Sequence, residues 1–61
     1  MTLEELGFAM TVEGNIVSYK KDGIIVDFNL EKHECITSYL DVELANEIKA
    51  AIEQKITNLG W

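Results

Sequence analysis

The sequence predicts a small α+β domain: a four-stranded antiparallel β-meander, a C-terminal α-helix packed on one face, and a short N-terminal helical turn (ββββα). Between residues 8 and 39, apolar and polar residues alternate around the turn signals Gly14-Asn15 and Asp22-Gly23. From residue 44 to 59 the apolar spacing becomes that of an amphipathic helix. With 61 residues, of which 48% are hydrophobic, the chain is expected to be one domain, residues 1–61, near the lower size limit for folding unaided.

A capping box opens the chain. Its two members, Thr2 and Glu5, supply a hydroxyl and a carboxylate to the free backbone amides of the first turn. We therefore expect one helical turn over residues 2–6, with the Met1 side chain packed against Leu6.

The two ends of the chain share a helix-stop phrase, LEELGF at residues 3–8 and ITNLGW at residues 56–61. In such a phrase the Gly takes the left-handed conformation, and the aromatic residue after it contacts the apolar residue that opens the phrase. We expect both aromatic residues to close the core in this way, which leaves no room for a functional tail, a linker or a second domain.

Two tight turns fix the pairing of the first three strands. Gly14-Asn15 suits a type II′ hairpin between residues 8–12 and 16–21, and Asp22-Gly23 suits a type I′ hairpin that leads into residues 24–30. Because each turn has two residues, the cross-strand partners follow directly. The expected pairs are Met10 with Tyr19, Val12 with Val17, Tyr19 with Val26, and Val17 with Phe28.

These pairs divide the sheet into a core face and a wet face, as in other antiparallel sheets that are covered on one side. The expected core face is apolar and consists of Phe8, Met10, Val12, Val17, Tyr19, Ile24, Val26, Phe28 and Leu30. The expected wet face is mostly polar and consists of Ala9, Thr11, Ile16, Ser18, Lys20, Ile25, Asp27 and Asn29.

A third reversal at residues 31–33 leads to an edge strand over residues 34–39, whose register depends on the loop length. The alternatives are an even loop, with Cys35, Thr37 and Tyr39 turned inward, and an odd loop, with Ile36 and Ser38 turned inward. We prefer the even loop, because it places the cysteine and the tyrosine inside.

Apolar residues at helical spacing follow Asp41, which is a suitable N-cap. They form one stripe, Leu44, Ile48, Ile52, Ile56 and Leu59, flanked by Ala45 and Ala51. We expect a helix over residues 42–59 that lies across the core face of the sheet.

The net charge of −6 comes from eleven acidic residues and five lysines, without any arginine. This composition argues against direct nucleic-acid binding, which relies on clustered lysine and arginine. The acidic residues are dispersed, as is typical of an ordinary soluble surface. An alternative function is that of an acidic decoy, which inhibits a nucleic-acid-binding host protein by imitating its ligand.

No group of residues predicts catalysis, a cofactor or a metal site. His33 and Cys35 are two potential zinc ligands, but a structural zinc site uses four. Ser18 or Ser38 could join His33 in a triad, yet the Gly-x-Ser-x-Gly elbow is missing, as is a glycine-rich phosphate loop. The lone cysteine fits a reducing cytoplasm, and no stretch approaches the roughly 20 apolar residues that span a bilayer.

The predicted wet face carries more apolar side chains than a surface that only contacts water needs. They are Ile16, Ile25 and, with the even loop, Ile36. Together with Lys20 and Asp27 they form the candidate interaction surface. We expect a non-enzymatic protein that acts by binding proteins. Its partner is a second copy of the chain, in a homodimer, or a host or phage protein, and the contact is made through this face or an exposed edge strand.

The phrase at residues 3–8, the Asp22-Gly23 turn and the phrase Leu59-Gly60-Trp61 together resemble a group of small uncharacterised proteins encoded by phages and prophages of Gram-positive bacteria. The resemblance covers the whole chain. It implies a phage or prophage origin and a location in the host cytoplasm, and it assigns no activity and no catalytic residue.

Overall fold

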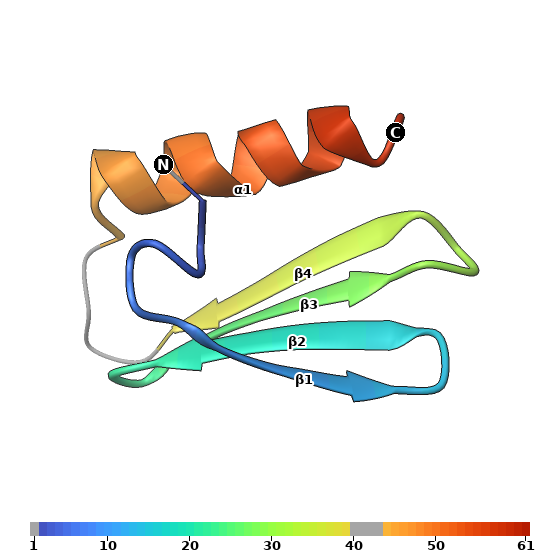
Figure 1. Cartoon of the computed structure of the whole chain (residues 1–61), viewed down its shortest axis with the longest axis horizontal. Coiled ribbons are helices and arrows are strands. Elements are labelled where there is room, and N and C mark those ends of the chain that lie inside the picture. The colour runs from blue at the N-terminus through green and yellow to red at the C-terminus, as the bar shows by residue number, and fades with distance from the viewer. Residues whose placement is uncertain (1, 40–43) are drawn as a thin grey trace.

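The computed structural model describes residues 2–39 and 44–61, which form two layers (Figure 1). Within these residues, four antiparallel strands form one sheet in the order β1-β2-β3-β4, and one helix, α1, lies across one face. The elements are β1 (Ala9–Glu13), β2 (Ile16–Lys21), β3 (Ile24–Asn29), β4 (Glu34–Tyr39) and α1 (Asn46–Asn58). The predicted ββββα fold is confirmed.

The N-terminal turn is held by the predicted capping box. The Thr2 amide donates to Glu5 Oε1 at 3.0 Å, and the Glu5 amide donates to Thr2 Oγ1 at 3.1 Å. The Leu6 amide closes the single turn on the Thr2 carbonyl at 3.1 Å, and the Lys21 ammonium on β2 binds the Leu6 carbonyl. The turn is thereby tied to the sheet, while the predicted Met1 contact lies outside the described residues.

Both helix-stop phrases adopt the predicted backbone geometry. Their glycines are left-handed, with φ values of +95° at Gly7 and +78° at Gly60. The aromatic residue after each glycine donates its amide to the carbonyl five positions earlier, at 3.0 Å for Phe8 and 3.2 Å for Trp61. Phe8 is buried and Trp61 is half-buried, and both contact the core.

The hairpin turns have the dihedral signs that their sequences predict. Asp22 and Gly23 both have positive φ, at 45° and 82°, as a type I′ turn requires. In the first turn φ is positive at Gly14, at 57°, and not at Asn15, which is the type II′ pattern. All the predicted pairs occur: Met10 with Tyr19, Val12 with Val17, Tyr19 with Val26, and Val17 with Phe28.

The register of β4 matches the even-loop alternative. The loop spans residues 30–33, and Cys35 is the cross-strand partner of the core residue Phe28. Cys35, Thr37 and Tyr39 therefore share the face that α1 covers. Cys35 is half-buried against the core as predicted, but Tyr39 at the end of the strand remains 51% exposed.

The helix is shorter than the predicted range of 42–59, because α1 begins at Asn46 and ends at Asn58. Ala45 is the N-cap, is extended with ψ of 150°, and makes no side-chain capping bond. The predicted cap, Asp41, lies outside the described residues. Leu44 still packs against the core, because an extended residue just before a helix can reach the same apolar layer as the helical stripe.

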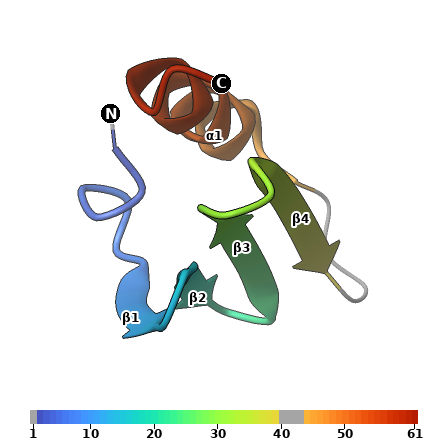
Figure 2. The ribbon, with the colours of Figure 1, turned by 90° about the vertical axis from the view of Figure 1, so that its right-hand side faces the viewer.

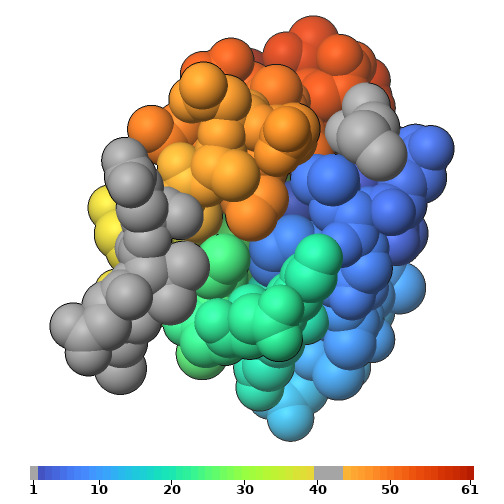
Figure 3. Space-filling model, turned by 90° about the vertical axis from the view of Figure 1, so that its left-hand side faces the viewer, coloured from blue at the N-terminus to red at the C-terminus, as the bar shows by residue number. Residues whose placement is uncertain are grey.

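The core lies between α1, the N-terminal turn and the middle of the sheet. Its buried side chains are Leu3, Phe8, Tyr19, Ile24, Val26, Phe28, Ala51 and Ile52. Tyr19 and Phe28 form its aromatic centre, with ring centroids 5.9 Å apart and planes at 89°. Figure 3 shows the N-terminal segment and the helix side by side above the turn between β2 and β3, where they close one end of the core.

Three residues predicted on the core face are exposed instead of buried: Met10 at 52%, Val12 at 58% and Leu30 at 40%. The cross-strand pairs show that Met10 and Val12 do share this face. The helix lies above β3 and β4, however, and β1 is farther from it (Figure 2). Leu30 follows the last residue of β3 and lies in the turn. The prediction of the face was right for β1, and the prediction of burial was wrong.

Candidate functional site

The outer face of the sheet, opposite to α1, carries all five residues of the predicted interaction surface. Cross-strand pairing aligns Lys20 with Ile25 and Asp27 with Ile36, and Ile16 begins β2 on the same face. The exposed fractions of the isoleucines are 40% at Ile16, 37% at Ile25 and 56% at Ile36. We call these five residues the outer-face patch.

Asp27 lies at the centre of the outer-face patch. Its cross-strand partner on β4 is Ile36, and Ile25 lies two residues before it on the same face of β3. On β2 the Ser18 hydroxyl donates to Asp27 Oδ1 at 2.5 Å. Asp27 is half-buried, and a carboxylate can accept further hydrogen bonds beyond this one. The patch therefore combines apolar area with one central acceptor.

The isoleucines do not form one continuous stripe. Ile25 is paired with Ser38, two residues beyond Ile36, so Ile25 and Ile36 are diagonal neighbours, about 7–8 Å apart. Ile16 is paired with Asn29 at the other end of the face. A partner surface that covers Ile25 and Ile36 necessarily covers Asp27 as well.

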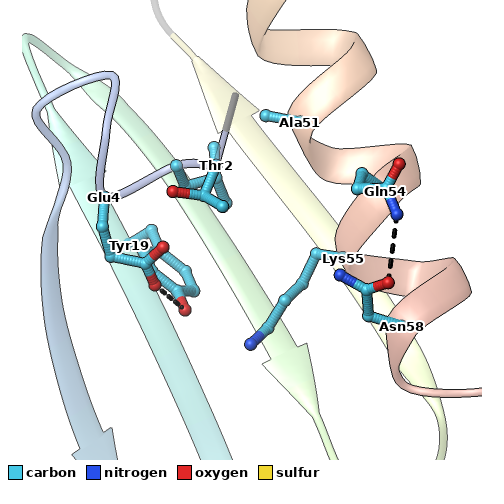
Figure 4. A pocket seen from close by; sticks show the side chains of 8 residues that line it. Thr2, Glu4, Tyr19, Ala51, Gln54, Lys55 and Asn58 are labelled. Atoms are coloured by element: carbon cyan, nitrogen blue, oxygen red, sulfur yellow. Dashed lines mark hydrogen bonds between the residues drawn. The ribbon is translucent and has the colours of Figure 1, made fainter.

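A small pocket between the N-terminal turn and α1 was not predicted from the sequence (Figure 4). Its volume is about 110 Å³, and its lining comes from the turn, from β2 and from the helix. The lining residues are Thr2, Leu3, Glu4, Tyr19, Ala51, Gln54, Lys55 and Asn58. Ligand pockets commonly enclose about 300–1,000 Å³, so this pocket is too small for a typical metabolite.

A hydrogen bond joins two elements at the edge of this pocket. The Tyr19 hydroxyl donates to Glu4 Oε1 at 2.7 Å, and the Lys55 ammonium lies 5.9 Å from the centre of the Tyr19 ring. Burial raises the pKa of Tyr19 to about 12, and the bond to Glu4 adds to the effect. The same bond lowers the pKa of Glu4. The group thus ties the N-terminal turn to the sheet.

We expect the stabilising effect of the Tyr19 hydroxyl to depend on pH. Since burial raises the Tyr19 pKa from 10.0 to about 12, the hydroxyl contributes its full stability below pH 10 and loses it as the pH rises through 12. The free energy of unfolding should therefore be higher for the wild type than for Tyr19→Phe below pH 10, and the difference should shrink above it. Urea denaturation of both proteins across this range measures the difference, and a constant difference would contradict the assignment.

The residues considered for metal binding or catalysis are not brought together. His33 lies in the turn before β4, where its ring stacks on Trp61 at 5.1 Å, while Cys35 packs against the core. Burial raises the pKa of the Cys35 thiol, which disfavours the thiolate that would bind a metal. The Ser18 hydroxyl is bonded to Asp27. Over residues 2–39 and 44–61, no three His, Cys, Asp or Glu side chains are grouped as metal ligands.

Comparison of the chain with protein-family models, with curated proteins and with solved structures gives no match. In the described part of the chain, no helix has both the length and the apolar character needed to cross a bilayer. The geometry of the chain's own residues is therefore the basis for the functional proposal.

Proposed function

We propose that this protein is a non-enzymatic interaction module that binds another protein through the outer-face patch. The observation that supports the proposal is the exposure of Ile16, Ile25 and Ile36, at 37–56%, around a half-buried carboxylate. Exposed apolar side chains that are grouped with polar residues on one face are a feature of protein contact sites.

The chemistry of the patch defines its partner. Contact with Ile25 and Ile36 removes water from Asp27, whose charge then needs a hydrogen-bonded counter-charge. The matching surface is apolar and carries one lysine or arginine, which can donate to the free acceptor sites of the carboxylate. The net charge of −6 favours encounter with a basic partner.

We also propose where this contact takes place: the protein is an accessory protein of a phage or prophage, and it acts in the cytoplasm of the host. This setting is supported by the resemblance of the end phrases and of the Asp22-Gly23 turn, and by the lone Cys35, which suits a reducing compartment. The partner is then a host or phage protein, and neither a nucleic acid nor a membrane is part of the proposal.

We expect the double variant Ile25→Lys/Ile36→Lys to lose its partner, because two ammonium groups replace the apolar area around Asp27. The matched control is Ala50→Lys/Glu53→Gln, which changes the net charge equally at two exposed positions of α1. Affinity capture from a bacterial lysate, at low and at high salt, compares both variants with the wild type.

A protein that the wild type and the control retain at both salt concentrations, and that the outer-face variant loses, supports the proposal. A basic protein that all three release at high salt indicates the acidic decoy instead, since exposed charge pairs are screened by salt. Equal capture by the outer-face variant and the control would overturn the outer-face patch as the binding surface.

A further inference from the structure

Among residues 2–39 and 44–61, strand β1 has no second partner strand and is an edge of the sheet. It is paired on one side with β2, and all five of its residues are exposed. Edge strands are commonly protected from pairing by lysine, proline or a β-bulge. Residues 9–13 contain no lysine and no proline, and they pair with β2 one to one without a bulge. The single charge of β1, Glu13, is at its end.

The hairpin turn determines which backbone groups of β1 are free to pair. A two-residue loop makes Glu13 and Ile16 a hydrogen-bonded pair, and such pairs alternate along an antiparallel ladder. The amides and carbonyls of Glu13, Thr11 and Ala9 are therefore directed to β2. Those of Met10 and Val12 point out of the sheet. The same two residues have the exposed side chains on the inner face, at 52% and 58%.

We propose that β1 pairs antiparallel with β1 of a second copy of this chain, around a two-fold axis at Thr11. Met10 then faces the partner's Val12, and each of these two pairs exchanges two backbone hydrogen bonds. This contact is made by the β1 edge, shares only Lys20 with the outer-face patch and does not depend on the proposed function.

The edge is complementary to itself in this register. Met10 and Val12 of both copies cover one another on the inner face, which α1 leaves open. On the outer face, the partner's Glu13 is opposite Ala9, and Lys20 is the neighbour of Ala9 on β2. Because Ala9 is small, the Lys20 side chain can reach across it to the partner's Glu13, and symmetry repeats this ion pair.

Neighbouring registers are less favourable. A two-fold axis at Met10 would place Val12 opposite the partner's Phe8, but the Phe8 amide already binds the Leu3 carbonyl at 3.0 Å. An axis at Val12 would place Met10 opposite Gly14 of the partner subunit, which lies in the hairpin turn. The axis at Thr11 keeps all five residues of β1 in the contact.

In the resulting assembly, the four strands described in each chain join into one eight-stranded sheet, with both helices on the same side. Its outer side presents two copies of the outer-face patch in one surface. A contact made by one five-residue strand is at the small end of protein interfaces, so we expect a weak dimer that forms with increasing concentration.

A pair of cysteine variants tests the register. In a Cys35→Ala background, Thr11→Cys places two thiols at the axis, where the Cα atoms of a non-hydrogen-bonded pair are about 4.5 Å apart, within disulfide range. The control, Ala9→Cys, is on the same face of the same strand and keeps the Glu13 charge, but its Cα lies about 13 Å or more from its symmetry mate. We expect mild oxidation to convert the Thr11→Cys protein into a covalent dimer and to leave the Ala9→Cys protein without a covalent bond between copies.

Sedimentation equilibrium over a range of concentrations tests the contact without a disulfide. Val12→Lys should weaken dimerisation on the order of tenfold or more, because a lysine on the inner face of the edge would be covered by apolar neighbours. Ile36→Lys, on the opposite edge strand, should leave dimerisation unchanged. A wild type that stays monomeric at all concentrations, or equal cross-linking of the two cysteine variants, would overturn the inference.

Discussion

Replacing Phe28 by alanine is expected to remove most of the stability of the domain. Phe28 is fully buried, and its ring contacts Tyr19 at 5.9 Å and Trp61 at 6.2 Å between centroids. Truncation of a buried Phe to Ala costs about 3–5 kcal/mol. At about 0.05–0.15 kcal/mol per residue, a chain of 61 residues has a total of only about 3–9 kcal/mol.

Urea denaturation of Phe28→Ala, followed by circular dichroism, measures this loss. Phe28→Leu is the matched core variant and should cost less, since it keeps most of the apolar volume. Ile36→Ala, at a residue that is 56% exposed, should change the free energy of unfolding by no more than about 0.5 kcal/mol. If the free energy of unfolding of Phe28→Ala were within about 1 kcal/mol of the wild-type value, Phe28 would not be the centre of the core.

Trp61→Ala is expected to lower the free energy of unfolding by about 1–3 kcal/mol. The half-buried indole lies 6.2 Å from Phe28 and is stacked on the His33 ring at 5.1 Å, with the planes 9° apart. The substitution keeps the backbone bond from residue 61 to the Ile56 carbonyl. The loss therefore reports the side-chain contacts alone.

His33→Ala separates the two contacts of the indole. This variant removes the exposed stacking partner but leaves the contact with Phe28, so it should lose less stability than Trp61→Ala. Thermal unfolding of the three proteins compares them directly. An unchanged melting temperature for Trp61→Ala would show that the second helix-stop phrase does not close the core.

The strand pairing could be predicted from the sequence because two dipeptides determine it. Asp22-Gly23 and Gly14-Asn15 each allow few backbone conformations, and a two-residue turn leaves one register for the strands on either side. Four residues of the outer-face patch follow from the same geometry, namely Ile16, Lys20, Ile25 and Asp27. The fifth, Ile36, is on that face because the loop at residues 30–33 has an even length, and the two dipeptides do not determine that length.

Coverage of the sheet could not be predicted in this way. Periodicity shows which face of a strand is apolar, but not how far the covering helix extends. A helix about 10 Å wide spans about two strands spaced about 4.8 Å apart, so one helix cannot cover four strands. Met10 and Val12 on β1 consequently share the inner face with the core and remain exposed.

The start of the helix and the pocket were missed for other reasons. Apolar spacing from Leu44 onward fits a helix, but it fits an extended approach to one equally well, and Ala45 is extended. The bond between Tyr19 and Glu4 joins residues fifteen positions apart. No local pattern indicates such a contact, because it depends on how the N-terminal turn is placed over β2.

The simple strand order has a consequence for folding. Each strand pairs with its neighbour in the chain, so the sheet needs only short loops to close and can form early. The contact of Leu3 with the helix joins distant parts of the chain and carries the larger entropic cost of closure. The outer-face patch belongs entirely to the locally paired part, so it can persist when the helix and the N-terminal turn open transiently.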